Sequence, residues 1–208
     1  MAVAPSWESP GTGAGGPSLR DRILAAAAHL TSTDGWAKVT MARLAAAVGV
    51  SRQTVYNEVG GKPDLAEAMV LNELARFLAE VDRAFEEHPD DLLAAVGEAC
   101  RGILELAQDN ELLHAVVSAT HGAETELLPL LTTHAESLLT TAKTMLGDRI
   151  APYDLDLTPR QREVVVDVVV RSMLSHVMQP SGTPAETAAD VVWVASRVLA
   201  IDPAPAAP

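Results

Sequence analysis

The sequence predicts an all-α fold of about nine helices, divided into a small N-terminal unit and a larger C-terminal one. Apolar residues recur at three- and four-residue spacing through most of the 208 residues. Ser or Thr stands before several of these segments in the pattern of a helix cap. Strand-like segments do not alternate with the helical ones, so a doubly wound sheet or a barrel is not expected.

Both ends of the chain have compositions typical of disordered segments. Residues 1–18 are rich in Pro, Gly, Ser and Ala and carry too few large apolar side chains to bury a core. Residues 202–208 alternate Pro and Ala in the same manner. We therefore expect a disordered arm over 1–18, a disordered tail over 202–208, and folded domains over 19–62 and 63–201.

Three helices are expected within 19–62. The first follows a capping pattern at Ser18 and ends at Gly35. The second and third are short, the second starting after Thr40 and the third running from Ser51 to about Asn57, and Gly49 separates them. This is the spacing of a helix-turn-helix.

Four helices are expected to follow, over about 63–88, 90–108, 110–121 and 123–146, the last with a bend near Pro129. Two more begin with a Thr-Pro pair that has Gln or Glu three residues after the Thr, giving helices over about 159–178 and 184–200. The valine run 164–170 has high strand propensity, but its cap and the uninterrupted apolar stretch favour a helix.

Charge is unevenly distributed along the chain. The net charge is −13, which by itself argues against a nucleic-acid partner. Residues 19–62 nevertheless carry a net charge of +3, and residues 63–208 carry −15. A basic segment on an acidic body can meet phosphates while the body is repelled from the duplex.

The helix that begins at Ser51 carries side chains of the types that contact DNA in the major groove. Its expected outward residues, Arg52, Gln53, Tyr56 and Asn57, are types that contact phosphates and base edges, whereas Val50 and Val55 face inward. The alternative from the residues alone is a surface helix with no role in DNA binding.

Residues 19–65 resemble the DNA-binding domain of the TetR family of regulators. The resemblance lies in the Ile23–Ala27 start, Asp34-Gly35-Trp36, Val39-Thr40, the run Ala46–Ser51, Thr54-Val55-Tyr56 and Lys62. It implies an N-terminal three-helix helix-turn-helix domain plus a C-terminal helical ligand-binding and dimerisation domain. It also implies a homodimer, double-stranded DNA with a palindromic operator as partner, and a small apolar effector.

By that resemblance, a set of polar residues would meet DNA. They are Thr40, Arg43, Ser51, Arg52, Gln53, Thr54, Tyr56, Asn57 and Lys62. The sequence departs from the family at Val59, where an aromatic residue is common, and Glu58 is unfavourable near phosphates unless it points away. The Tyr-Asn-Glu version resembles a subgroup of which some members sense fatty acids or acyl-CoA.

The C-terminal helices are expected to surround an apolar pocket and to form a dimer. Candidate pocket residues are Leu74, Leu78, Ile103, Val117, Leu138, Met145, Met173 and Val177, each of which could equally be plain core. His121, His134 and His176 are candidate polar anchors, with a structural role as the alternative. On the last helix, the stripe Ala188, Val191, Val192, Ala195, Val198 and Leu199 suits a dimer interface.

Other classes of function find little support in the sequence. There is no Gly-rich phosphate loop after a strand, no metal-ligand spacing and no nucleophile signature, so we expect no enzyme, no metal and no cofactor. Cys100 lies in a core pattern, and neither a membrane span nor a signal peptide is expected. The prediction is a cytoplasmic, ligand-responsive regulator, most often a repressor by analogy with the family. The alternative is an adaptor of the same fold that binds a protein partner without recognising DNA.

Overall fold

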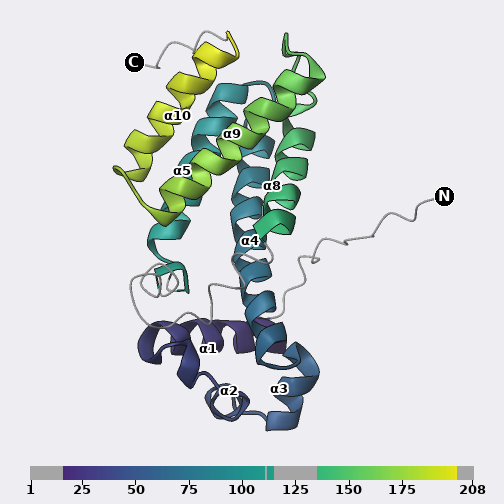
Figure 1. Ribbon diagram of the computed structural model, residues 1–208, viewed down its shortest axis with the longest axis vertical. Helices are drawn as coiled ribbons and strands as arrows, with labels where there is room; N and C mark the ends of the chain where they lie inside the picture. Colours follow the sequence, from purple (N-terminus) through teal and green to yellow (C-terminus); the bar gives the residue numbers. More distant parts are fainter. Residues whose placement is uncertain (1–15, 111, 115–134, 201–208) are drawn as a thin grey trace, which may run out of the picture.

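The computed structural model describes residues 16–110, 112–114 and 135–200, and within these ranges all regular structure is helical (Figure 1). This confirms the all-α fold class. The elements are α1 (Leu19–Asp34), the 3₁₀ helix η1 (Trp36–Lys38), α2 (Met41–Val48), α3 (Arg52–Val59), α4 (Lys62–Glu87), α5 (Leu92–Gln108), α8 (Ala135–Ile150), α9 (Pro159–Met178) and α10 (Pro184–Val198).

The helix starts follow the side-chain chemistry read from the sequence. Ser18, Thr158 and Thr183 each accept a hydrogen bond from a backbone N–H three residues on, and in each case the third residue's side chain returns to the cap. These reciprocal bonds satisfy donors that a helix end otherwise leaves free. The valine run 164–170 lies inside α9, so the helical interpretation was correct.

Several boundaries differ from expectation. The 3₁₀ helix η1 was not predicted, and α8 continues four residues past the expected end, to Ile150. Most of the expected helix 110–121, the bend near Pro129 and the start of 123–146 lie outside the described residues, as do residues 1–15 and 201–208. Residues 112–114, which are described, are helical.

The elements form two parts joined by one long helix (Figure 1). The part made by α1, α2 and α3 (the head) lies at one end of the molecule, and α5, α8, α9 and α10 (the body) lie at the other. The 26-residue α4 starts in the head and runs into the body, where it packs against α5 and α8. A displacement of α4 in the body would therefore be carried to the head.

The head has its own hydrophobic core. Its centre consists of fully buried aliphatic side chains: Ile23, Val39, Leu44, Val55 and Leu65. The first two turns of α4 belong to this core through Leu65 and Met69, and so does Leu112, which follows α5 in the chain. The head therefore packs against two segments that continue into the body.

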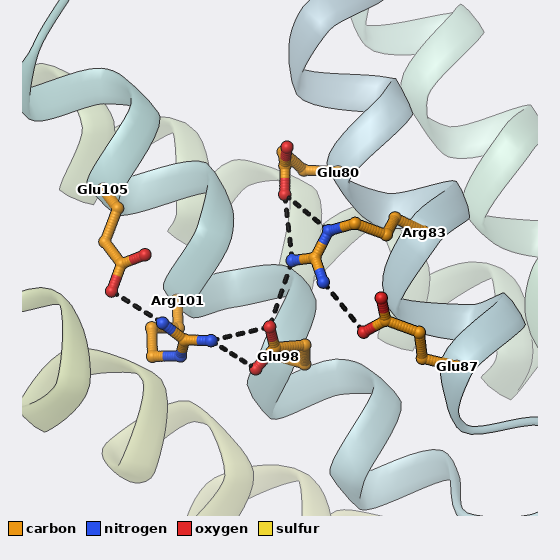
Figure 2. Close-up of polar contacts among 6 residues, drawn as sticks. All are labelled: Glu80, Arg83, Glu87, Glu98, Arg101 and Glu105. Atoms are coloured by element: carbon orange, nitrogen blue, oxygen red, sulfur yellow. Dashed lines mark hydrogen bonds and ion pairs between the residues drawn. The ribbon is translucent and has the colours of Figure 1, made fainter.

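Ion pairs line the outer seam between α4 and α5 (Figure 2). Arg83 on α4 donates to Glu80, to Glu87 and across the seam to Glu98 at 3.0 Å. Arg101 on α5 donates from its Nη2 to both carboxylate oxygens of Glu98, at 2.6 and 2.7 Å. These hydrogen bonds from Arg101 and Arg83 lower the pKa of Glu98. Glu98 therefore links α4 to α5 at the surface by charge-assisted hydrogen bonds.

In the described part of the chain, we find no helix whose length and apolar character would let it cross a membrane.

Candidate nucleic-acid interface and ligand cavity

The helix α3 is anchored to the head by one face and exposes the other. Val55 is fully buried and Val59 is 3% exposed, while Val50, just before the helix, is partly buried against the same core. Ser51 caps the helix by accepting a hydrogen bond from the backbone N–H of Thr54 at 3.0 Å. The inward orientation expected for Val55 is confirmed, so the polar face of α3 points away from the core.

Side chains on the outer face of α3 are arranged in two pairs. The Arg52 guanidinium donates to the Tyr56 hydroxyl at 3.2 Å and lies 5.4 Å from the centre of its ring. Gln53 donates its amide to Asn57 at 3.0 Å. Each pair spans one helical turn. All four of these hydrogen-bonding side chains are exposed.

At the start of α2, the side chain of Arg43, one of the residues expected to face DNA, already has partners within the head. Thr40 caps α2 by accepting a hydrogen bond from the backbone N–H of Arg43 at 3.2 Å. The Arg43 side chain is still exposed, but it forms an ion pair with Asp34 and donates to the Lys38 carbonyl. The hydrogen bond from Arg43 lowers the pKa of Asp34. To meet a phosphate through its side chain, Arg43 would have to exchange this partner.

Lys62 lies over an aromatic ring at the start of α4. Its ammonium is 4.9 Å from the centre of the Trp36 ring and 3.4 Å from the Ala37 carbonyl oxygen. Trp36 itself is only 4% exposed. The ring restricts the lysine, whose charge stays near the surface beside the first turn of α4.

Two basic residues of the head have structural roles that the sequence did not reveal. Arg22 donates to the Val48 carbonyl at 2.7 Å, at the end of α2. Arg20 donates to the Glu58 carbonyl near the end of α3. Cations at these carbonyls complement the negative ends of the two helices. Part of the positive charge of residues 19–62 therefore fastens the head together.

The body encloses a cavity of about 430 Å³. Its walls come from α4, α5, α8, α9 and α10 and from Asn110, Leu112 and Leu113, and they are almost entirely aliphatic. The volume falls in the range of small-molecule sites. Side chains of Leu, Val and Met give a lining that can adjust to ligands of differing shape.

Seven of the eight candidate pocket residues line this cavity. They are Leu74, Leu78, Ile103, Leu138, Met145, Met173 and Val177. The eighth, Val117, lies outside the described residues. The sequence did not identify Phe77, Val166 or Leu157, which also line the cavity. Helical periodicity finds inward positions, but it does not distinguish a cavity wall from solid core.

Two polar side chains stand out in the lining. Among the described residues of the wall, only Glu73 and Asn110 carry a carboxylate or an amide. Asn110 is 4% exposed and donates to Glu73, and its side-chain oxygen accepts from the Leu113 N–H at 2.8 Å. Glu73 also accepts from Arg76 at 3.0 Å, on the outer side of α4. One stretch of the wall is therefore polar and acidic.

Leu112 belongs to both the cavity and the head. It is 6% exposed, it lines the cavity, and it packs in the hydrophobic core of the head. Val70, one residue beyond the last head-core residue of α4, lines the cavity too. The space for a ligand therefore extends to the junction between body and head.

The remaining candidate groups have ordinary surroundings. Cys100 is 3% exposed in the body core, and its burial raises the pKa of its thiol to about 12, so it stays protonated. His176 contacts Ser181 at 3.2 Å and is not in the cavity wall, while His121 and His134 lie outside the described residues. In the described ranges, we find no group of three or more potential ligands that could hold a metal ion.

The stripe expected to form a dimer interface on the last helix was assigned to the wrong face. Ala188 is buried, and the Val192 methyl approaches α5 so closely that a Cβ at Gly97 would lie 2.9 Å from it. Val191, Ala195 and Leu199 also turn toward the body, and Val198 alone of that stripe is more than half exposed. Since α10 is apolar on more than one side, the side that packs inward is the one whose Val192 fits over Gly97 of α5.

Large apolar side chains are exposed on both α9 and α10. They are Val164 and Val168 on α9 and Trp193, Val194 and Val198 on α10, which are between 44% and 62% exposed. On the opposite side of α9, Val165, Val166 and Val169 line the cavity. The helix is therefore apolar on both sides, as expected, with one side covered within the chain.

Comparisons with known proteins agree with this architecture. The sequence model of "Bacterial regulatory proteins, tetR family" matches residues 23–69. That of "Bacterial Tetracyclin repressor, C-terminal domain" matches residues 91–197, about half of the chain. Together they cover the head and the body.

Two AlkX regulators are similar over nearly the whole chain. The HTH-type transcriptional regulator AlkX of Mycobacterium tuberculosis is 28% identical over 189 residues, covering 91% of this chain and 89% of that protein. The crystal structure of the TetR family repressor AlkX from Dietzia sp. strain DQ12-45-1b superposes with a TM-score of 0.68 at 27% identity, covering 89% and 97% of the two chains.

A regulator from Mesorhizobium loti (TM-score 0.62, 17% identity, 88% and 96% of the two chains) shares the fold alone.

Proposed function

The chain belongs to the TetR family of bacterial transcriptional regulators, and on that premise we propose that it is a repressor released from DNA by a small apolar ligand. The observation that carries the proposal is the combination, in one chain, of an exposed polar recognition helix and an aliphatic cavity that reaches the head.

Direct readout of DNA would come from α3. The major groove is about 12 Å wide and admits one helix. Arg52, Gln53, Tyr56 and Asn57 lie on the exposed face, and the capped start of α3 at Ser51 suits a phosphate. Thr40, Thr54 and Lys62 would position the backbone of the duplex, as would Arg43 after releasing Asp34. Glu58 is exposed too, and it would have to turn away from phosphates.

Dimerisation would use the exposed apolar side chains of α9 and α10. Five large apolar side chains are exposed on these two helices, and a partner that covered them would remove apolar surface from water. A twofold pair would place two α3 helices about 34–36 Å apart, one turn of DNA. The operator would then be a palindrome.

Release would be a population shift. A ligand in the cavity can change DNA affinity only if it binds one conformation better than the other. The route that we propose runs through α4 and Leu112, which touch both the cavity and the head core. Movement of either element would alter the spacing of the two α3 helices in a dimer.

The ligand class that we propose is a molecule with a long apolar chain. The wall of the cavity supports this, as does the Dietzia relative, which is described as implicated in biodegradation of n-alkanes. The subgroup resemblance in the sequence adds fatty acids and acyl-CoA as candidates. As a DNA-binding regulator, the protein would act in the bacterial cytoplasm.

We also propose the domain division 19–62 and 63–201 for these two activities, with the start of α4 packed in the head core.

DNA binding is tested by fluorescence anisotropy of the full chain with duplexes that span the region upstream of its own gene. We expect a preference for one palindromic site and an affinity that falls steeply with salt. Lys62→Ala should weaken binding to all duplexes and lower the salt slope by about one, whereas Asn57→Ala should weaken the preference for one sequence.

Arg160→Ala, an exposed arginine on α9, is the matched control and should leave DNA affinity unchanged. An adaptor that binds only a protein partner would show no site preference and no response to Tyr56→Ala or Lys62→Ala. That result would overturn the proposal. The comparisons, which name regulators and repressors, give the adaptor alternative no support.

A further inference from the structure

The Glu73–Asn110 pair is placed where the cavity meets the head. Glu73 projects from α4 four residues beyond Met69, the last α4 residue in the head core. Asn110 stands two residues before Leu112, which is shared by cavity and head. The polar stretch of the wall is therefore at the head end of the cavity.

The Glu73–Asn110 pair has more hydrogen-bond acceptor capacity left for a ligand than donor capacity. Asn110 donates one of its two amide N–H groups to Glu73, and its oxygen accepts from the Leu113 N–H. Glu73 accepts from Asn110 and Arg76, yet a carboxylate has about four lone-pair sites. What remains for a ligand is the acceptor capacity of Glu73 and one N–H of Asn110, so acceptor sites outnumber the donor. A group that donates a hydrogen bond fits this position.

We propose that Glu73, held by Asn110, is a polar subsite that selects an uncharged, hydrogen-bond-donating head group on an apolar chain, such as a primary alcohol. The rest of the wall receives the chain. This inference rests on the proposed function, whose ligand class it narrows.

An anionic head group is disfavoured in this position. A ligand carboxylate would meet the negative charge of Glu73, whose side chain is only 16% exposed. Arg76 offsets part of that charge from outside the cavity, but among the described wall residues there is no Lys, Arg or His that could pair with the ligand's own carboxylate. Arg76 lies on the outer side of Glu73, half exposed, and does not line the cavity. A fatty acid in its ionised form should therefore bind more weakly than the alcohol of equal chain length.

An alkane would fill the apolar part equally well but leave the acceptor unused. The alcohol gains a hydrogen bond to an ionised partner, which is stronger than one between neutral groups. We expect the order of affinity to be alcohol, then alkane, then carboxylate.

The test uses decanol, decane and decanoate with the full-length protein at about pH 8, where the carboxylate is ionised. Binding is measured by the shift in melting temperature and by displacement of an environment-sensitive fluorescent probe. Decanol should bind at least about tenfold more tightly than decanoate, a factor of ten being about 1.4 kcal/mol. Equal or tighter binding of decanoate, or failure of all three ligands to bind, would overturn the inference.

Two variants assign the preference to the subsite. Glu73→Gln keeps an acceptor for Asn110 but removes the charge, so the ratio of decanol to decanoate affinity should fall to within about threefold. Glu105→Gln, an equal change of charge on the outer surface of α5, is the matched control and should keep the wild-type ratio. A ratio unchanged by Glu73→Gln would refute the role of Glu73, and the wild-type measurement stands even if that variant fails to fold.

The same ligands, added to the complex with operator DNA, separate this inference from the proposed function. Selective binding without release of DNA would support the subsite and contradict the ligand-released repressor. Release of DNA by an apolar ligand, with no preference for decanol, would support the ligand-released repressor and contradict the subsite.

Discussion

The head and the body bury their apolar residues in different ways. All five of the largest fully buried side chains, among them Leu44, Val55 and Leu65, lie in residues 23–65 and form the head core. In the body, the completely buried positions are occupied by small residues such as Ala84 and Ala95, and larger side chains surround a cavity of about 430 Å³.

This difference matches the separate tasks that we propose for the two parts. A domain that recognises base edges must hold the side chains that contact them in fixed positions, which requires a core packed without voids. A sensor must exchange water or empty space for a ligand and must have more than one accessible arrangement. The cost of a substitution should therefore depend on the part in which it is made.

The largest contrast is expected between two Leu→Ala substitutions. Leu44→Ala removes a fully buried side chain from the head and should lower the free energy of unfolding by about 2–5 kcal/mol. Leu78→Ala removes a half-buried side chain that already borders the cavity, so the loss should stay under about 2 kcal/mol. Urea unfolding followed by circular dichroism measures both. Equal losses would show that the two parts are packed alike.

A second contrast lies within the body, between its tight seam and its open side. A Cβ at Gly97 would meet the Val192 methyl at 2.9 Å, whereas one at Gly147 would meet nothing within 4 Å. Both glycines are helical, so the gain in helix propensity cancels in the comparison. We expect Gly97→Ala to be less stable than Gly147→Ala by about 1–3 kcal/mol in the same urea assay. No difference would mean that α10 moves freely on α5.

A third contrast compares two helix caps. Ser51→Ala and Thr158→Ala each remove a side chain that accepts a backbone N–H at the start of a helix, and each should cost about 1 kcal/mol. Only Ser51→Ala should also weaken operator binding in the anisotropy assay, because only α3 is proposed to contact DNA. Loss of DNA affinity in Thr158→Ala would show that the body, too, determines the position of the recognition helix.

The smallest effect concerns the ion pairs between α4 and α5 (Figure 2). Because Arg101 and Arg83 lower the pKa of Glu98, the folded state binds a proton there more weakly than the unfolded state does. The stability from this carboxylate is therefore complete above its ordinary pKa of 4.5 and is lost as the pH falls through the lower, folded value.

The measurement compares urea unfolding of the wild type and Glu98→Gln between about pH 7 and pH 3. The difference in the free energy of unfolding between the wild type and Glu98→Gln should be largest at neutral pH. It should decrease as the pH falls and also in high salt. A gap that widens on acidification would contradict the assigned direction. Arg160 and Glu163, an exposed pair on α9, provide the control, since Glu163→Gln should change little.

Local chemistry determined much of this protein from its sequence. The caps at Ser18, Thr158 and Thr183, the glycine between α2 and α3, and the inward Val55 follow from short-range rules, and each is present in the structure. Helical periodicity also placed seven residues on the cavity wall. A hydrogen bond or a repeat within a few residues involves only neighbours that the sequence itself specifies.

Tertiary packing decided what depended on distant partners. Arg43 meets Asp34, Lys62 lies on Trp36, and Glu73 joins Asn110 across 37 positions of the chain. The face of α10 that packs inward was decided in the same way, because the space above Gly97 accepts Val192 while Trp193 remains outside. A helix that is apolar on two sides carries no local signal for which side is buried. Only the shape of the surface opposite, here α5, makes that choice.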